Sequence, residues 1–166
     1  MTTGPDTIEA HIPRLRRYAR ALTGERGSAD DLVQDTLERA LLKFALWQRG
    51  SDLRAWLFTI MHNVYVNQLR AKRESMYIED PDSIAMRESE SGMLDIMDLD
   101  RALQHLPVEQ REVVLLVGLE QLSYQEAAAA LGIPTGTVMS RLSRGRERLR
   151  MLLSRNADAA GLKVVK

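Results

Sequence analysis

The chain contains no cysteine. Disulfide bonds, thiolate nucleophiles and zinc sites with cysteine ligands are therefore excluded, and nothing indicates an oxidising compartment. The longest strongly apolar run, Val113 to Leu119, is far shorter than the roughly 20 residues that a membrane-spanning helix needs. The start, Met1 to Thr7, lacks the basic and apolar regions of a secretory signal. We therefore expect a soluble, cytoplasmic protein without membrane insertion.

Net charge is also lacking, because 23 Lys and Arg balance 23 Asp and Glu. A neutral chain argues at first against nucleic-acid binding, which basic side chains drive by displacing counterions from phosphates. The charges are unevenly distributed, however. Residues 1–75 carry 12 basic and 9 acidic side chains (+3), residues 76–105 carry 2 and 8 (−6), and residues 106–166 carry 9 and 6 (+3). Two basic lobes therefore flank an acidic segment.

Helical periodicity dominates the sequence, and no convincing strand-type alternation is present. The pattern predicts helices over residues 7–22, 29–44, 53–73, 94–106, 109–119, 124–131 and 135–153. Low hydropathy and an excess of acids favour a solvated linker after the third helix. We therefore predict an all-α protein of two small helical domains joined by a flexible acidic linker. The expected segments are residues 7–75, the linker 76–100, residues 101–155 and a tail, 156–166.

Two helix starts carry capping signals. Ser28 with Asp31, and Ser123 with Glu126, have the spacing of a capping box, in which a serine and an acidic residue three positions later each bond to the other's backbone amide. The helix expected after Ser28 has an apolar stripe at helical spacing, which predicts its buried side. The members of this stripe are Leu32, Val33, Thr36, Leu37, Ala40 and Leu41.

The strongest local signal lies over residues 123–150. Two short helices joined by the turn Gly132-Ile133-Pro134 have the layout of a helix-turn-helix, whose second helix enters the major groove of DNA. Small polar residues begin this second helix, and arginines follow, whose forked guanidinium groups suit guanine edges and phosphates. The candidate contacts to duplex DNA are Thr135, Thr137, Ser140, Arg141, Arg144 and Arg146. A merely solvated cationic helix is the alternative, which the agreement of turn, caps and arginines disfavours.

The helix expected over residues 53–73 carries a weaker signal. It interleaves aromatic and basic side chains, as single-stranded nucleic acid requires for stacking and for charge. The amides of Asn63 and Asn67 suit the reading of base edges. Trp56 lies on the apolar stripe, which favours a place in the core. On its residues alone, this helix only suggests nucleic-acid binding.

No catalytic constellation is found. His11, His62 and His105 are scattered and complete no metal site. The glycines never take the spacing of a phosphate-binding loop. The sequence therefore predicts a protein that is not an enzyme, with no catalytic residues, no metal and no cofactor.

Several motifs in a fixed order give the chain a family resemblance. They are Ala29-Asp30-Asp31-Leu32-Val33-Gln34-Asp35-Thr36, Leu53-Arg54-Ala55-Trp56-Leu57-Phe58-Thr59-Ile60-Met61-His62-Asn63 and, after the acidic segment, Leu106-Pro107, Leu122-Ser123-Tyr124-Gln125-Glu126 and Pro134-Thr135-Gly136-Thr137-Val138. From about residue 8 to residue 153, the chain resembles a bacterial RNA polymerase sigma factor of the extracytoplasmic-function type. The resemblance implies sigma region 2 in the first segment, sigma region 4 in the third, and promoter-specific initiation of transcription.

The resemblance also implies partners and contact residues. Core RNA polymerase would bind through its β′ clamp helices and its β flap, and an anti-sigma factor would control the chain. The residues matching the clamp-helix contact are Asp31, Gln34, Asp35 and Glu38. Those matching the reading and opening of the minus-10 element are Arg54, Trp56, His62, Asn63, Asn67, Arg70 and Arg73. The helix-turn-helix residues would contact the minus-35 element as duplex, and the acidic linker would pass through a basic polymerase channel.

Two other classes of function stay open at this point. A repressor or activator that acts without polymerase would use the same helix-turn-helix and would bind duplex DNA tightly by itself. A decoy that only captures an anti-sigma factor would not need the arginines of the last helix, so their presence argues against that class.

Overall fold

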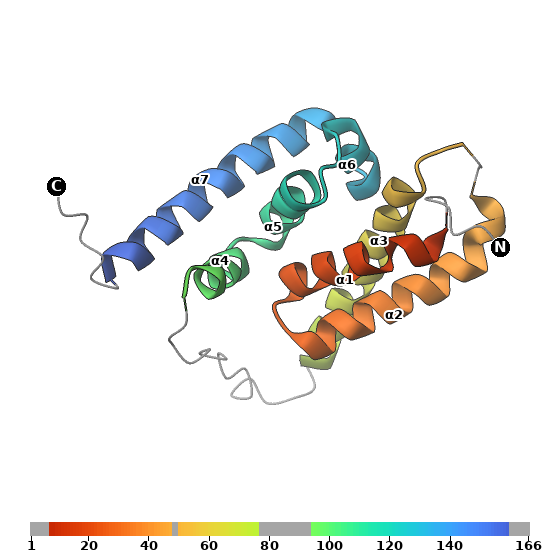
Figure 1. The fold of residues 1–166 in the computed structure, drawn as a ribbon, viewed down its shortest axis with the longest axis horizontal. Coiled ribbons are helices and arrows are strands. Elements are labelled where there is room, and N and C mark those ends of the chain that lie inside the picture. Colours follow the sequence, from red (N-terminus) through yellow and green to blue (C-terminus); the bar gives the residue numbers. More distant parts are fainter. Residues whose placement is uncertain (1–6, 48–49, 77–93, 160–166) are drawn as a thin grey trace.

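The computed structural model describes residues 7–47, 50–76 and 94–159, and every element in these ranges is helical. The prediction of an all-α fold is therefore confirmed. Figure 1 shows the elements in chain order. They are α1 (Ile8–Thr23), α2 (Arg26–Lys43), the short helix η1 (Phe44–Leu46), α3 (Leu53–Met76), α4 (Leu94–Gln104), α5 (Val108–Val114), the π-helical turn η3 (Leu115–Leu119), α6 (Tyr124–Leu131) and α7 (Thr135–Ala159).

Helices α1 to α3, with η1, form what we call the first lobe. Gly24 ends α1 in the left-handed conformation, with φ of 73°, and α2 then returns beside α1 (Figure 1). Helix α3 packs on both. The lobe buries Leu15, Tyr18 and Leu22 from α1 against Leu57 and Met61 from α3.

Helices α4 to α7, with η3, form the second lobe. The long helix α7 runs along α5 and also contacts α4 and α6 (Figure 1). A Cβ at Gly145 would lie 2.7 Å from Val114 Cγ2, so α7 and α5 approach very closely there. Val138 and Leu142, on the same side of α7 as Gly145, are buried as well. Helix α4 begins at Leu94, inside the segment that composition predicts as linker; residues 77–93 lie outside the described residues.

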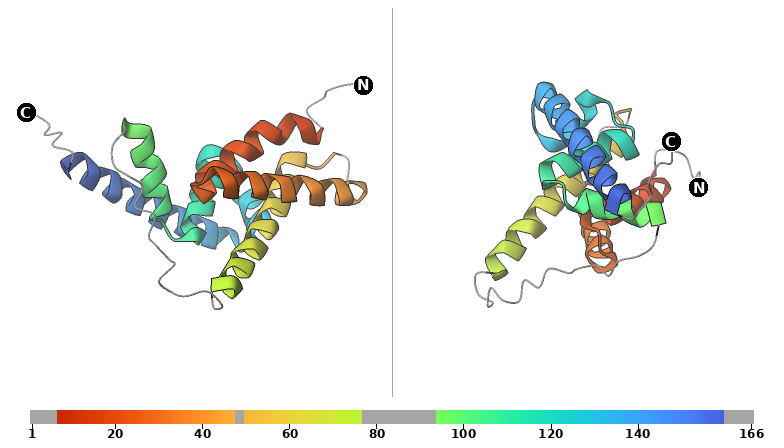
Figure 2. Two further views of the ribbon diagram at one scale, coloured as in Figure 1. Left: turned by 90° about the horizontal axis from the view of Figure 1, so that it is seen from below. Right: turned by 90° about the vertical axis from the view of Figure 1, so that its left-hand side faces the viewer.

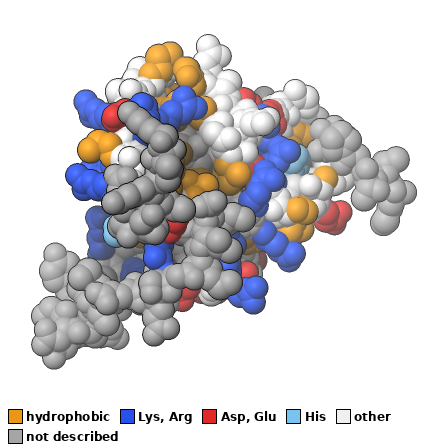
Figure 3. Space-filling model, turned by 60° about the vertical axis from the view of Figure 1, so that its left-hand side comes forward, with side chains coloured by type: hydrophobic (Ala, Val, Ile, Leu, Met, Phe, Trp, Pro, Cys, Tyr) orange, Lys and Arg blue, Asp and Glu red, His pale blue; other side chains and the backbone are white. Residues whose placement is uncertain are grey.

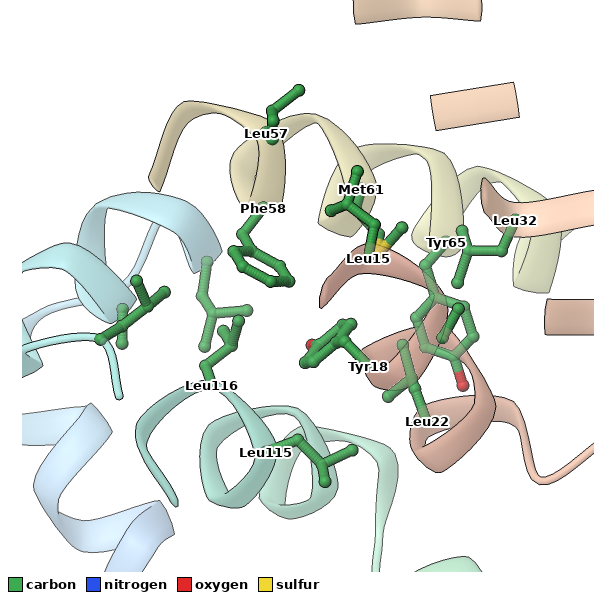
Figure 4. Packing of buried hydrophobic residues seen from close by; sticks show 14 of the residues in the cluster. Leu15, Tyr18, Leu22, Leu32, Leu57, Phe58, Met61, Tyr65, Leu115 and Leu116 are labelled. Carbon is green, nitrogen blue, oxygen red and sulfur yellow. The ribbon is translucent and has the colours of Figure 1, made fainter. Parts of the chain in front are cut away.

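The two lobes pack on one another around one hydrophobic core. Leu115 and Leu116 of η3 lie opposite Tyr18 of α1 and Phe58 of α3 (Figure 4). The Tyr18 and Phe58 rings meet edge to face, with centroids 5.0 Å apart. Two further views show the second lobe against the first from different sides (Figure 2). The described part of the chain is therefore closed rather than extended.

The capping signals have different outcomes. Ser123 and Glu126 form a complete capping box at the start of α6, so that prediction is confirmed. The cap at Ser28 is wrong, because the turn at Gly24 lets α2 begin earlier, at Arg26, and the Ser28 hydroxyl donates to the Glu25 carboxylate instead. Leu41 was expected to be buried and is 67% exposed, because the C-terminal turn of α2 lies at the outer edge of the molecule (Figure 1).

Candidate functional site

An acidic and amide-rich surface runs along α2. Its four residues matching a polymerase contact are all exposed: Asp31, Gln34, Asp35 and Glu38. Gln34 lies one turn before Glu38, with Nε2 3.5 Å from Oε1, and Gln68 of α3 donates to Asp35 at 2.7 Å. The structure therefore presents these residues together on one accessible face.

An exposed apolar group continues this surface. Leu41, Leu42 and Leu46 are 67%, 86% and 77% exposed, and Phe44 stacks on Trp47 at 5.7 Å. Sequence reasoning missed this group because apolar residues at helical spacing favour burial. No local signal identifies the group, because adjacent apolar residues are buried elsewhere in the chain, as at Leu57 and Phe58. Exposed apolar patches of this kind commonly mark contact surfaces.

The candidate minus-10 residues on α3 divide into two groups. Asn63, Asn67, Arg70 and Arg73 are exposed. Trp56 is half-buried and packs against the core, as its place on the apolar stripe favours. Arg54 and His62 are also half-buried, and both contact the second lobe.

Carboxylates of the second lobe contact both Arg54 and His62. Arg54 Nη2 lies 3.7 Å from Glu126 Oε2 and 3.6 Å from Asp52 Oδ2, and Arg54 also donates to the Glu120 carbonyl at 3.3 Å. His62 Nδ1 lies 2.5 Å from Glu112 Oε2. Burial acts to raise the pKa of Asp52, but its carboxylate accepts hydrogen bonds from the backbone amides of Ala55 and Arg54 and faces the Arg54 charge, which leaves that pKa below its ordinary value. Sequence spacing does not reveal the contacts of Arg54 and His62 with Glu126, Glu120 and Glu112, which lie in the other lobe.

The helix-turn-helix is formed as predicted. Gly132 ends α6 in the left-handed conformation, with φ of 66°, and the Ile133 amide donates to the Ala128 carbonyl at 3.1 Å. Helix α7 then begins at Thr135. Ser140, Arg144 and Arg146 are exposed, whereas Thr135, Thr137 and Arg141 are half-buried.

Candidate minus-10 and minus-35 residues meet in one cleft. A cavity of about 360 Å³ between the lobes is lined by His62, Arg70 and Arg73 of α3 and by Arg141 of α7. Figure 3 shows basic side chains in separate groups over one face, with hydrophobic and uncharged side chains between them. The two predicted readers of DNA thus face one another in this structure.

Two further features concern metal binding and membrane crossing. Among the side chains that the structure describes, no three histidines or acids gather closely enough to bind a metal ion. Within residues 7–47, 50–76 and 94–159, none of the helices has the length and hydropathy that crossing a bilayer requires.

Comparison with known proteins identifies the family. Residues 8–62 match the sigma2 domain of PhyR, and residues 96–149 match sigma-70 region 4. Over 153 residues the chain is 40% identical to the ECF RNA polymerase sigma factor EcfG of Rhodopseudomonas palustris, covering 89% of this chain and 83% of that relative. The chain belongs to the extracytoplasmic-function sigma factors. It is therefore a promoter-specific transcription initiation factor.

Solved structures agree with this assignment. The sigma factor RpoE in complex with the anti-sigma factor NepR, from Bartonella quintana, matches with a TM-score of 0.78 and 38% identity, over 89% of this sigma factor and 94% of that chain. CnrH in complex with the cytosolic domain of CnrY matches with a TM-score of 0.66 and 27% identity, over 89% and 85%. Both matches extend over both lobes of the present sigma factor.

Proposed function

We propose that this sigma factor binds core RNA polymerase through the exposed face of α2 and directs it to promoters with minus-10 and minus-35 elements. The observation that carries the proposal is the joint exposure of Asp31, Gln34, Asp35 and Glu38 on one helix face, in a chain of this family. Carboxylates and amides suit a basic partner surface, here the β′ clamp helices. The second lobe would contact the β flap.

The promoter is read in two ways in this proposal. The exposed amides of Asn63 and Asn67, with Arg70 and Arg73 further along α3, suit single-stranded bases and backbone of the minus-10 element. The exposed arginines at the start of α7 suit duplex DNA of the minus-35 element. Two weak readers on one chain bind two spaced elements with an effective concentration that neither has alone.

Regulation and location are part of the proposal. The likeness to two sigma factors solved with anti-sigma proteins supports control of this chain by an anti-sigma factor. Initiation at chromosomal promoters requires the cytoplasm, and the factor would act there by binding, without catalysis of its own.

Run-off transcription with core polymerase over a fragmented genomic library tests the proposal. Wild-type chain is expected to start transcription at a defined set of promoters. Replacing Arg141 and Arg144 together with alanine should reduce initiation at least about tenfold, because each lost base contact is worth about 1–3 kcal/mol.

The matched control replaces Arg150 and Arg155, two exposed arginines further along α7, and changes the net charge equally. It should retain most of the activity. Unchanged initiation by the Arg141 and Arg144 variant would contradict the assignment of the recognition helix. Tight, specific promoter binding without polymerase would indicate a stand-alone regulator instead.

A further inference from the structure

We propose that Met139 of α7 reads a thymine of the minus-35 element, and that oxidation of its thioether by a peroxide weakens promoter recognition. The inference rests on the function proposed above, because it adds a base contact and a modification site to the same recognition helix. The exposure of this side chain, its place on α7 and its chemistry support it.

Met139 is a large apolar side chain that the fold leaves at the surface. It is 49% exposed, whereas Val138, the residue before it, is fully buried. Single exposed apolar residues are common on protein surfaces, so exposure alone assigns no role to Met139. Its place on the recognition helix does.

Met139 lies in the part of α7 that enters the major groove. The helix begins at Thr135, and the N-terminal residues of a recognition helix contact base edges. At 3.6 residues per turn, Met139 lies about 100° around the helix from Val138, which faces the core. It therefore flanks the side opposite the core, where Gly136 and Ser140 are exposed.

The surface beside Met139 is made of small residues. Positions three and four residues apart are neighbours on a helix, and Gly136 and Ser143, both exposed, are such neighbours of Met139. Among the described atoms, none lies within 4 Å of a Cβ built at Gly136. Two turns further along the same flank, Arg146 is exposed and suits a phosphate. The Met139 thioether can therefore reach base edges while Arg146 holds the backbone.

A thioether at this place selects an apolar group. On the major-groove edges of the base pairs, that group is the C5-methyl of thymine. Methionine is flexible and polarisable, so it fits closely around such a group. Covering one methyl changes the affinity by about fourfold. Met139 thus adds a preference for thymine to the polar contacts of Ser140 and the arginines.

The same sulfur is open to oxidation. A lone pair of Met139 Sδ attacks one oxygen of hydrogen peroxide, the O–O bond breaks and an S–O bond forms. Sulfur is oxidised and the peroxide is reduced, and the second oxygen leaves as water with both protons. The sulfoxide is polar, and its oxygen finds only another acceptor, O4, beside the thymine methyl. An unsatisfied acceptor in the contact should weaken binding at least about fivefold.

The rest of the chain offers a matched control for this reaction. With no cysteine, the chain has no thiolate that would take up the peroxide first. Met61 is fully buried, and Met151 is 50% exposed. Met151 follows Met139 by twelve residues, about 18 Å along the helix axis, which exceeds the width of the major groove, about 12 Å. It therefore matches Met139 in exposure but not in base contact.

A first experiment removes the thymine methyl. In a promoter found by run-off transcription, uracil replaces each thymine of the minus-35 element in turn, which deletes only the C5-methyl. With core polymerase, wild-type chain should bind the most sensitive of these duplexes about fourfold more weakly. Met139→Ala should bind the thymine duplex about fourfold more weakly and should not distinguish uracil from thymine. Met151→Ala should distinguish them as wild type does.

Two results of this experiment would overturn the proposal. One is wild-type chain that is insensitive to the loss of every methyl in the minus-35 element. The other is a Met139→Ala variant that distinguishes thymine from uracil as strongly as wild type.

A second experiment oxidises the full-length chain with hydrogen peroxide, removes the peroxide with catalase and then adds core polymerase. Mass spectrometry should find sulfoxide at Met139 and Met151 and not at Met61. Initiation by wild-type chain, relative to its untreated form, should fall at least about fivefold, and methionine sulfoxide reductases should restore it. Met151→Leu should show the same loss, whereas Met139→Leu, relative to its own untreated form, should lose much less.

An equal loss in Met139→Leu and wild type contradicts the proposal, as does full initiation by wild-type chain with sulfoxide at Met139. Wild-type chain that never directs initiation with core polymerase contradicts the proposed function itself. Initiation at a defined set of promoters without a methyl or peroxide effect contradicts only the role of Met139.

Discussion

Gly145 sets how closely α7 approaches α5. A Cβ there would lie 2.7 Å from Val114 Cγ2 and 3.4 Å from Gln110 Cβ. Because Val114 is stiff at χ1, relief requires a shift of one helix relative to the other. We expect Gly145→Ala to lower the free energy of unfolding by about 1–3 kcal/mol, measured by urea denaturation.

Gly136 provides the matched control on the same helix. Nothing lies within 4 Å of a Cβ at this position, so alanine adds only helix propensity. Gly136→Ala should stabilise the chain by up to about 1 kcal/mol. Equal effects of the two substitutions would show that helix propensity, and not the close approach of α7 and α5, determines the outcome at Gly145.

Individual site residues differ in how far the sequence predicts them. The exposure of Asn63, Arg70 and Arg144 follows from their spacing against the apolar stripes. The pairing of His62 with Glu112, 50 positions along the chain, does not, because helical periodicity describes one element at a time. Glu120 is also unpredictable for this reason: its burial depends on arginines of another lobe.

At the scale of single elements, Ser123 and Ser28 have the same sequence signal and different structures. Ser123 accepts from the Glu126 amide at 3.1 Å, and Glu126 accepts from the Ser123 amide at 2.9 Å. Ser28 lies inside α2, which starts at Arg26. The spacing of a cap is local, whereas the start of α2 depends on where Gly24 turns the chain. Sequence therefore identifies the helices better than their first residues.

The difference between the two serines is testable. Ser123→Ala removes one half of the capping box from α6, an eight-residue helix, and should lower the free energy of unfolding by about 1 kcal/mol. Ser28→Ala removes only an exposed hydrogen bond to Glu25 and should change it by less than about 0.5 kcal/mol. Thermal unfolding followed by circular dichroism measures both. A larger loss at Ser28 would restore the sequence-based interpretation of that site.

The π-helical turn is the element that the sequence predicts least well. Leu115 to Leu119 reads as a continuous apolar helix, and Gln121 carries no glycine signal for its positive φ. Both features exist because Leu115 and Leu116 pack into the core that the lobes share, while Glu120 meets the arginines of α1. Tertiary contacts, and not local propensity, account for this element.

At the scale of the whole molecule, the neutral net charge results from charges that are distributed unevenly along the chain and partly paired between the lobes. The sequence divides into segments of +3, −6 and +3, which predicts two basic lobes and an acidic linker. The structure adds pairing between the lobes, since Glu112, Glu120 and Glu126 face His62, Arg17 and Arg54. Arg54, a candidate DNA contact, is thus paired with carboxylates within the closed chain, and we expect the free chain to bind DNA weakly.

The shared core predicts that both lobes unfold together. Leu116 of η3 is 1% exposed and lies among residues of α1 and α3, and the two tryptophans of the chain, Trp47 and Trp56, belong to the first lobe. Leu116→Ala should cost about 2–5 kcal/mol. It should therefore lower the urea midpoint of tryptophan fluorescence as much as the midpoint of circular dichroism, although the substitution lies in the second lobe. If the lobes unfolded independently, the fluorescence midpoint would keep its wild-type value, and the circular dichroism transition would split in two.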